Sequence, residues 1–327
     1  MTTRRQFLVA LTALHPIVAR AQPARSAGKP ARVGILYTAD AKTERARNKV
    51  LVDTMRELGW VEGRNIVYDR ATADGDYARL PALAARLVAG KPDLIYVAAS
   101  QEVRAALAAT RTIPIIFSAT NDPVASGLVR SLARPGGNVT GVANIGPELG
   151  PKRLQLIREA MPKVSRVGLL ISPAIAPLQI ERKLIDEAAG GHLKIVPAII
   201  NEVGDLEAAF KMLVDSRVEA VLTTHIALFF RLRKNIFDIA GRYRLPVVGH
   251  RSLFAEDGAL MTYSSNLNEQ IRRSAYLVDK VLRGTKPADI AVEQPTKFEL
   301  VINLKIAKAL GITIPEKVLL RADRVIE

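Results

Sequence analysis

Cysteine is absent from this chain of 327 residues, which excludes disulfide cross-links and thiolate chemistry. Aromatic residues make up only 5%, and histidine occurs four times. His192, His225 and His250 are isolated in the sequence, with no H-x-x-x-H pair, so no metal site is expected. G-x-S-x-G, G-x-G-x-x-G and Walker A motifs are all missing. We therefore expect no cofactor, no catalytic residue set and no enzyme activity.

Positive charge is in excess, with 47 Lys and Arg against 32 Asp and Glu and a net charge of +15. The excess is spread along the chain and forms no long basic block, which favours a solvated basic surface. A nucleic-acid face is the alternative, but no basic helix pair, zinc finger or aromatic–basic pattern accompanies the charge. We expect no nucleic-acid partner.

The N-terminus has the layout of a secretory signal. Arg4 and Arg5 precede a short apolar run from Phe7, and the stretch ends in Ala19-Arg20-Ala21. The "TRRQFL" string resembles the twin-arginine export motif. A buried N-terminal helix is the alternative. We predict a signal peptide over 1–21, cleavage near Ala21, a flexible lead-in over 22–31 and a periplasmic location.

Short apolar runs alternate with amphipathic stretches from residue 32 onward, which predicts βαβ units and parallel sheets. The first half is expected to hold five strands and four helices. The predicted strands are 32–37, 65–71, 92–100, 113–120 and 138–144, and the predicted helices are 44–60, 77–90, 101–110 and 123–137.

The second half repeats this order, and "RVGILY" at 32–37 returns as "RVGLLI" at 166–171. Strands are expected at 166–172, 193–200, 218–225, 245–250 and 259–265, with helices at 176–191, 205–216, 228–244 and 252–258. The repetition predicts an α/β protein of two similar doubly wound parallel-sheet lobes, with a cleft between them.

Ligands of parallel α/β sheets bind at the carboxyl ends of the strands. Small polar residues occupy these ends here, without an assembled catalytic set. The candidate ligand-binding residues are Tyr37, Thr38, Ser100, Ser118, Asn121, Asp122, Ser172, Thr224, His225, His250 and Arg251. Asp122 also suits a helix cap before Pro123, Arg251 a surface position, and the histidines ordinary hydrogen-bonded positions. Tyr37 and either Phe229 or Phe230 are the candidates for stacking on a ligand.

Four long phrases carry a family resemblance: "LGWVEGRNIVYDRATADGDYARLPALAARLV", "IPIIFSATNDPVASGLVRSLARPGGNVTGVA", "ELGPKRLQLIREAMP" and "VEQPTKFELVINLKIAKALGITIP". The chain, from residue 32 to its end, resembles ABC-transporter substrate-binding proteins of the tryptophan/phenylalanine-binding type. The resemblance implies a type I periplasmic binding protein, with two α/β lobes, three hinge crossings and a small solute enclosed between the lobes.

Hinge crossings are then expected near 142–148, 263–268 and 294–297, with Asn144, Asn266 and Pro295 at the turns. Lobe one would comprise 32–143 plus 266–294, and lobe two 144–265 plus 295–327.

The expected function is delivery of a small solute, an amino acid or a small and possibly aromatic carboxylate, to an ABC permease in the inner membrane. The protein is expected to act as a monomer. The alternatives are a periplasmic receptor that feeds a membrane sensor, and a secreted enzyme.

Overall fold

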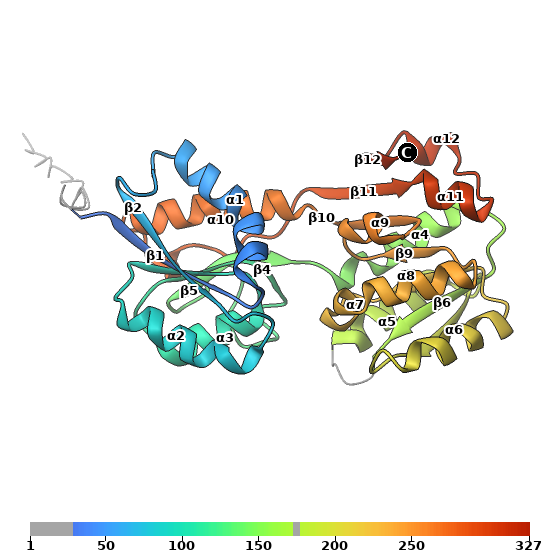
Figure 1. Cartoon of the computed structure of the whole chain (residues 1–327), viewed down its shortest axis with the longest axis horizontal. Coiled ribbons are helices and arrows are strands. Elements are labelled where there is room, and N and C mark those ends of the chain that lie inside the picture. The colour runs from blue at the N-terminus through green and yellow to red at the C-terminus, as the bar shows by residue number, and fades with distance from the viewer. Residues whose placement is uncertain (1–28, 173–176) are drawn as a thin grey trace, which may run out of the picture.

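The computed structural model describes residues 29–172 and 177–327, which form two α/β lobes lying side by side (Figure 1). The predicted signal peptide, its cleavage site and most of the predicted lead-in lie outside the described residues. Among the residues that are described, no helix has the length and apolar character needed to cross a membrane.

Lobe one is built on a five-stranded parallel sheet in the order β2-β1-β3-β4-β5. Its strands are β1 (Ala31–Tyr37), β2 (Ile66–Thr72), β3 (Leu94–Val97), β4 (Ile115–Asn121) and β5 (Val139–Asn144). The interior strands are buried on both faces, which is why their sequences are nearly continuous apolar runs.

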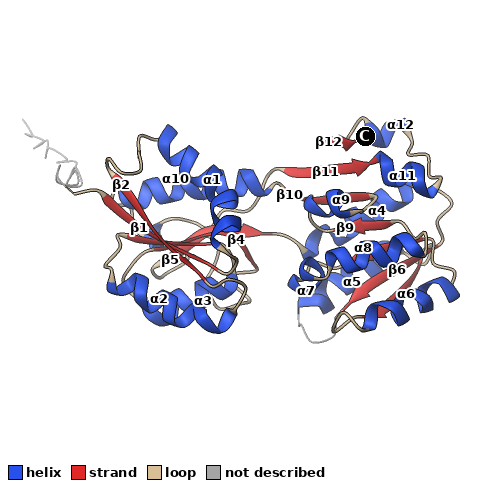
Figure 2. Cartoon of the chain, viewed as in Figure 1, coloured by secondary structure: helices blue, strands red, loops and turns tan. Residues whose placement is uncertain are grey.

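Helices cover both faces of this sheet (Figure 2). They are α1 (Ala41–Glu57), η1 (Tyr77–Arg79), α2 (Leu80–Ala89), α3 (Ser100–Ala109), α10 (Leu267–Leu282) and η3 (Pro287–Asp289). One core cluster joins the sheet to α1 and α10, through residues such as Leu51 and Ile271. A second cluster joins it to α2 and α3, through Leu87 and Val103.

Lobe two has a seven-stranded sheet in the order β12-β11-β10-β9-β8-β6-β7. Its strands are β6 (Arg166–Ile171), β7 (Lys194–Ile199), β8 (Ala220–Thr223), β9 (Val247–Gly249), β10 (Met261–Ser265), β11 (Phe298–Asn303) and β12 (Arg324–Ile326). Pairing is parallel except between β10 and β11, which run antiparallel. The sequence analysis, which expected parallel sheets, did not foresee this reversal.

The helical segments in the described part of lobe two are η2 (Pro147–Leu149), α4 (Gly150–Ala160), α5 (Pro177–Ala189), α6 (Asp205–Asp215), α7 (Ala227–Arg231), α8 (Arg233–Arg242), α9 (Leu253–Asp257), α11 (Leu304–Leu310) and α12 (Glu316–Leu319). Helices α4, α5, α11 and α12 pack on one face of the sheet, and α6 to α9 on the other.

The two lobes share one strand order. In each lobe the first strand lies between the second and the third, and the fourth and fifth follow, so β2-β1-β3-β4-β5 corresponds to β7-β6-β8-β9-β10. The repeated phrases at Arg32–Tyr37 and Arg166–Ile171 are the first strands of the two units. The prediction of two similar α/β lobes is confirmed.

The chain passes between the two sheets three times. It leaves β5 for η2 over 144–147, leaves β10 for α10 over 265–267, and reaches β11 from the Val142–Glu293 bridge over 293–298. Asn144, Asn266 and Pro295 lie in or beside these segments. That the chain bends there stays a prediction.

The prediction of a helix at 123–137 is wrong. This stretch forms turns and bends, with Ser126 N–H bonded to Asp122 O and Leu128 N–H to Pro123 O. Gly127 has a φ of +67°, a left-handed conformation that interrupts a right-handed helix. The helix expected at 228–244 is divided at Leu232 into α7 and α8.

Candidate ligand-binding site between the lobes

A cavity of about 470 Å³ lies between the two lobes and is lined by residues of both. Lobe one contributes the end of β1, the first turns of α1, and the ends of β3 and β4. Lobe two contributes residues that follow β8 and β9, the end of β10, and residues of η2, α4, α7 and α9. Asn144, Gly146 and the start of α10 complete the lining. The cavity therefore lies at the carboxyl ends of strands of both sheets, as is usual for α/β proteins.

The lobe-one wall is formed by Tyr37 and by one face of α1. Asp40 caps this helix by accepting hydrogen bonds from the backbone N–H groups of Lys42 and Thr43. The cap fixes where the helix starts, so Thr43, Ala46 and Arg47, spaced three and four residues apart, face the cavity together.

Arg47 forms no ion pair with any acidic residue in the part of the chain that the structure describes. Its guanidinium carbon lies 5.7 Å from the centroid of the Tyr37 ring, and its buried Nε has no hydrogen-bond partner within the described chain. Glu44, one turn earlier on α1, directs its Oε1 to Arg70 and Asn48 and forms no ion pair with Arg47.

The lobe-two wall carries two histidines at the ends of neighbouring strands. The rings of His225 and His250 stack with centroids 5.0 Å apart and an interplanar angle of 29°. His250 Nδ1 lies 2.9 Å from the Thr223 hydroxyl, and its Nε2, on a residue only 1% exposed, has no partner among the described residues. Burial lowers the pKa of both imidazoles well below the usual value, so both are neutral at pH 7.

Arg251 follows His250 and is the second charge without a counter-ion. Its guanidinium carbon lies 5.1 Å from the Phe230 ring centroid, and its Nε is unpartnered in the described part of the chain. Burial, with the positive charge of Arg47 as a second cause, lowers the pKa of Arg251 to about 10. The Arg251 side chain is therefore still cationic at pH 7, although the charge of Arg47 on the opposite lobe makes it easier to deprotonate. Arg233, over the same ring, is paired with Asp257 at 2.8 Å.

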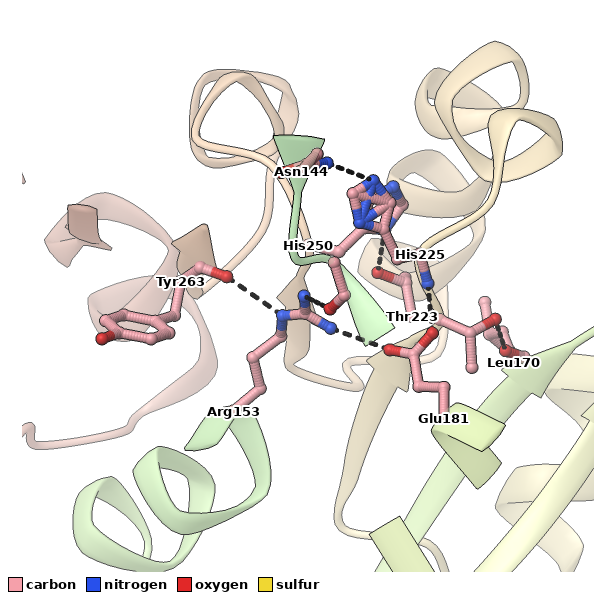
Figure 3. A network of polar contacts seen from close by, with 10 residues as sticks. Asn144, Arg153, Leu170, Glu181, Thr223, His225, His250 and Tyr263 are labelled. Atoms are coloured by element: carbon pink, nitrogen blue, oxygen red, sulfur yellow. Dashed lines mark hydrogen bonds and ion pairs between the residues drawn. The ribbon is translucent and has the colours of Figure 1, made fainter. Parts of the chain in front are cut away.

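A third arginine, Arg153, is fully compensated. It is fully buried and donates to Glu181 Oε1 at 2.9 Å, to Tyr263 O at 3.0 Å and to Gly146 O at 2.8 Å (Figure 3). Glu181 Oε2 accepts the backbone N–H of His225. Burial opposes both charges, lowering the pKa of Arg153 and raising that of Glu181. The pair fixes the backbone at two crossing segments and at His225.

Asn144 connects both lobes at the edge of the cavity (Figure 3). Its Nδ2 donates to Asn121 Oδ1 at 2.9 Å and lies 3.3 Å from His225 Nε2, while its Oδ1 accepts from the Ser265 hydroxyl at 2.8 Å. Gly146, two residues on, lies so close to the His225 ring that a Cβ there would fall 1.7 Å from Nδ1. The first crossing segment is thus in direct contact with a cavity side chain.

The lining is positively charged overall. Among the described residues that line the cavity there are Arg47, Arg153 and Arg251 but neither Asp nor Glu. Nor do residues 29–172 and 177–327 contain a group of three or more His, Asp or Glu that could hold a metal ion. The cavity offers guanidinium, imidazole and hydroxyl groups, which suit an anion.

The structure brings four of the predicted binding residues to the cavity: Tyr37, His225, His250 and Arg251. Phe230, one of the predicted stacking residues, also lines it, whereas Phe229 is fully buried in the lobe-two core. Arg47, Arg153, Ser264, Ser265 and Asn268 line it without having been predicted.

The other predicted residues do not line the cavity. Thr38 donates to Glu102, and Thr224 donates to Leu170 O inside lobe two. Asp122 Oδ1 accepts from Ala125 N at a φ of +32°, within a turn, because the helix that it was expected to cap is not formed. The remaining ones are Ser100, Ser118, Asn121 and Ser172. Proximity to a strand end is not enough, because adjacent residues of a strand point to opposite faces.

Residues 32–326 match a family model described as ABC transporter substrate binding protein. The chain is 27% identical over 284 residues to a tyrosine-binding protein of Clostridioides difficile strain R20291, covering 86% of this chain and 81% of that protein. A solved ABC domain from Streptococcus pneumonia in complex with L-Trp is 26% identical with a TM-score of 0.80, covering 91% of this chain and 100% of the other. A conserved domain protein from Vibrio cholerae O1 biovar eltor is 29% identical, with the same TM-score and coverage. With nearly its whole described length matched, the chain belongs to the ABC-transporter substrate-binding protein family.

Proposed function

We propose that this family member is an extracytoplasmic receptor that encloses a small solute between its lobes and delivers it to an ABC permease in the inner membrane. The observation that carries the proposal is the cavity whose opposite walls present Arg47 and Arg251, two cations without counter-ions. Both side chains are partly buried, and each has a buried Nε without a partner in the described chain, which is costly. A ligand that pairs with the two guanidinium groups explains why they are retained.

Closure of the lobes is the proposed means of binding. Three segments join the lobes, and Asn144, Asn266 and Pro295 are the proposed hinge residues. A ligand shifts the equilibrium toward the closed form to the extent that both walls contact it only there. The contact of Gly146 and Asn144 with His225 places one crossing segment beside the ligand cavity.

The proposed ligand is an amino acid or a small carboxylate, and compounds with an aromatic ring belong to the test panel. Guanidinium groups bind carboxylates with paired, charge-assisted hydrogen bonds. The relatives named for tyrosine and in complex with L-Trp support a ligand of this size. Tyr37, Phe230, His225, His250 and Arg251, together with Arg47, are the proposed contacts.

Location, oligomeric state and absence of turnover belong to the same proposal. The arginine pair and apolar run at 4–21 support export to the periplasm, with removal of the segment near Ala21. We propose a monomer that releases its solute unchanged, because among the described lining residues no side-chain hydroxyl is hydrogen-bonded to a histidine.

A thermal-shift screen of the purified mature chain against amino acids and small carboxylates tests the receptor function. A compound that binds only the native state raises stability by about 2.7 kcal/mol at a hundredfold excess over its Kd. Titration calorimetry should then give one solute per chain, and the recovered solute should be chemically unchanged. Formation of product at steady state, or no stabilisation by any small solute, would contradict the proposal.

A further inference from the structure

The two uncompensated guanidinium groups belong to opposite lobes. Arg47 is held on α1 of lobe one, and Arg251 follows β9 in lobe two. Each has its face on an aromatic ring of its own lobe, Tyr37 or Phe230, and each has an unpartnered buried Nε. After burial, the positive charge of Arg47 is the second cause that lowers the pKa of Arg251.

Closing the lobes around an empty cavity would bring these like charges closer in a poorly hydrated space, where repulsion is strong. A carboxylate between them reverses the sign of the interaction, because each guanidinium then faces a negative group. His250 Nε2, which is 1% exposed and unpartnered in the described chain, adds a neutral group at the same wall.

A ligand ammonium finds no matching group. None of the described lining residues is Asp or Glu, and the buried carboxylate of Glu181 is bound by Arg153 and by His225 N–H. One face of each of the Tyr37 and Phe230 rings is taken by a guanidinium. An ammonium group would add a third positive charge to the site.

We infer that the solute is an organic acid whose carboxylate bridges Arg47 and Arg251 and thereby permits closure, and that the site prefers such an acid to the corresponding amino acid. The inference rests on the proposed receptor function and names its substrate class.

Calorimetry with two matched series tests the preference: 3-phenylpropanoate, L-phenylalanine and 2-phenylethylamine, and 4-methylpentanoate, L-leucine and 3-methylbutylamine. Within a series that binds, the acid should bind at least about tenfold more tightly than the amino acid, and the amine should not bind. An amino acid that binds as tightly as its acid, or more tightly, overturns the inference.

The arginine variants test the bridge. Arg47→Gln and Arg251→Gln should each weaken binding of the preferred acid about 10- to 100-fold, since each removes a charged hydrogen bond. Arg111→Gln, at an exposed position of lobe one, is the matched control and should leave the affinity unchanged. Unaltered affinity in both cavity variants, with unaltered melting temperatures, would mean that the carboxylate lies elsewhere.

The ligand-free protein gives a readout that needs no ligand. Because the chain has no cysteine, Lys42→Cys and Arg231→Cys, both exposed and on opposite lobes, accept spin labels without background. Adding Arg47→Gln with Arg251→Gln should shift the interspin distances toward shorter values, because the repulsion is gone. An unchanged distribution overturns the gating by charge. If the protein binds an uncharged or cationic solute instead, the receptor function stands and only the inference of a bridging carboxylate is refuted.

Discussion

His225 and His250 stack on each other at 5.0 Å between ring centroids, and each carries a nitrogen without a hydrogen-bond partner in the described chain. Phe254 packs edge-on against His250 at 4.6 Å. Burial is the main cause that lowers both imidazole pKa values, and the charges of Arg251 and Arg153 lower them further. The pair is therefore a neutral, donor-bearing wall.

Stability should fall in mildly acidic solution because of these two histidines. In the unfolded chain they titrate near pH 6.5, whereas their folded pKa values are lower. The unfolded state thus binds more protons below about pH 6.5, and the free energy of unfolding decreases as pH falls through that window. We expect a loss of about 1.4 kcal/mol per pH unit for each histidine, and urea denaturation from pH 8 to pH 5 would measure it.

His250→Asn is the matched variant for this measurement, since the amide can replace Nδ1 at Thr223. In this variant the pH dependence of the free energy of unfolding should fall to the part that His225 contributes. An identical slope in variant and wild type would assign the pH dependence to other groups.

Glu181→Gln should destabilise the fold by about 3–5 kcal/mol, because it leaves the buried Arg153 charge without a partner at 2.9 Å. Glu159→Gln removes a similar but more exposed pair with Arg321 and should cost less than about 1 kcal/mol. Denaturant midpoints of the two variants give the comparison. Equal effects would show that burial does not increase the contribution of the Arg153–Glu181 pair to stability.

Gly146→Ala should impair ligand binding and lower stability, since its Cβ would meet the His225 ring at 1.7 Å and the backbone would have to shift. Gly137→Ala provides the control, because nothing lies within 4 Å of the Cβ that it adds. Crystal structures or melting temperatures of both variants decide the matter. A Gly146→Ala protein with native affinity would place the first crossing segment outside the binding mechanism.

Comparing Tyr37→Ala with Ser100→Ala tests whether the ligand binds in the observed cavity or at the strand end that was predicted from the sequence. Tyr37 lines the cavity and lies beneath Arg47, so its loss should weaken the best ligand of the screen about fivefold or more. Ser100 is not among the lining residues, and its variant should bind like wild type. The reverse order, measured by calorimetry, would move the ligand to the start of α3.

Export should require both arginines of the "TRRQFL" string. The double variant Arg4→Lys with Arg5→Lys should accumulate as a precursor in the cytoplasm, because the twin-arginine motif depends on the pair. Cell fractionation with the general secretion pathway blocked measures this. Normal secretion of the double variant would show that another route exports the protein.

The lobes were predictable from the sequence because strands buried on both faces leave continuous apolar runs such as 32–37 and 166–171. The failure at 123–137 has a local cause. Its apolar spacing suits a helix, but Gly127 takes a left-handed conformation, and Pro123 and Pro135 limit the remaining backbone. Turn geometry here overrides periodicity.

The site was predictable only in part, because it is made by two sheets facing each other. His250 and Arg251 could be found, since they follow a buried strand directly. Arg47 could not, since it lies in the middle of a basic helix and only the placement of α10 and lobe two shows which α1 face meets the cavity. Asp40 as a cap, with positions 43, 46 and 47 one and two turns later, was the available sequence indication.

Helix α10 has a consequence for how the chain must be made. It supplies Ile271, Ala275 and Val278 to the core of lobe one, although it is translated after the lobe-two elements from η2 to β10. When only the residues up to Asn144 have left the ribosome, α1 is present but α10 is not. The face of the sheet that packs on these two helices is then only partly covered. Lobe one cannot mature as an autonomous N-terminal unit, in contrast to proteins whose domains fold one by one during synthesis. The helix that covers the remaining part of this face is synthesised only after residues 144–265.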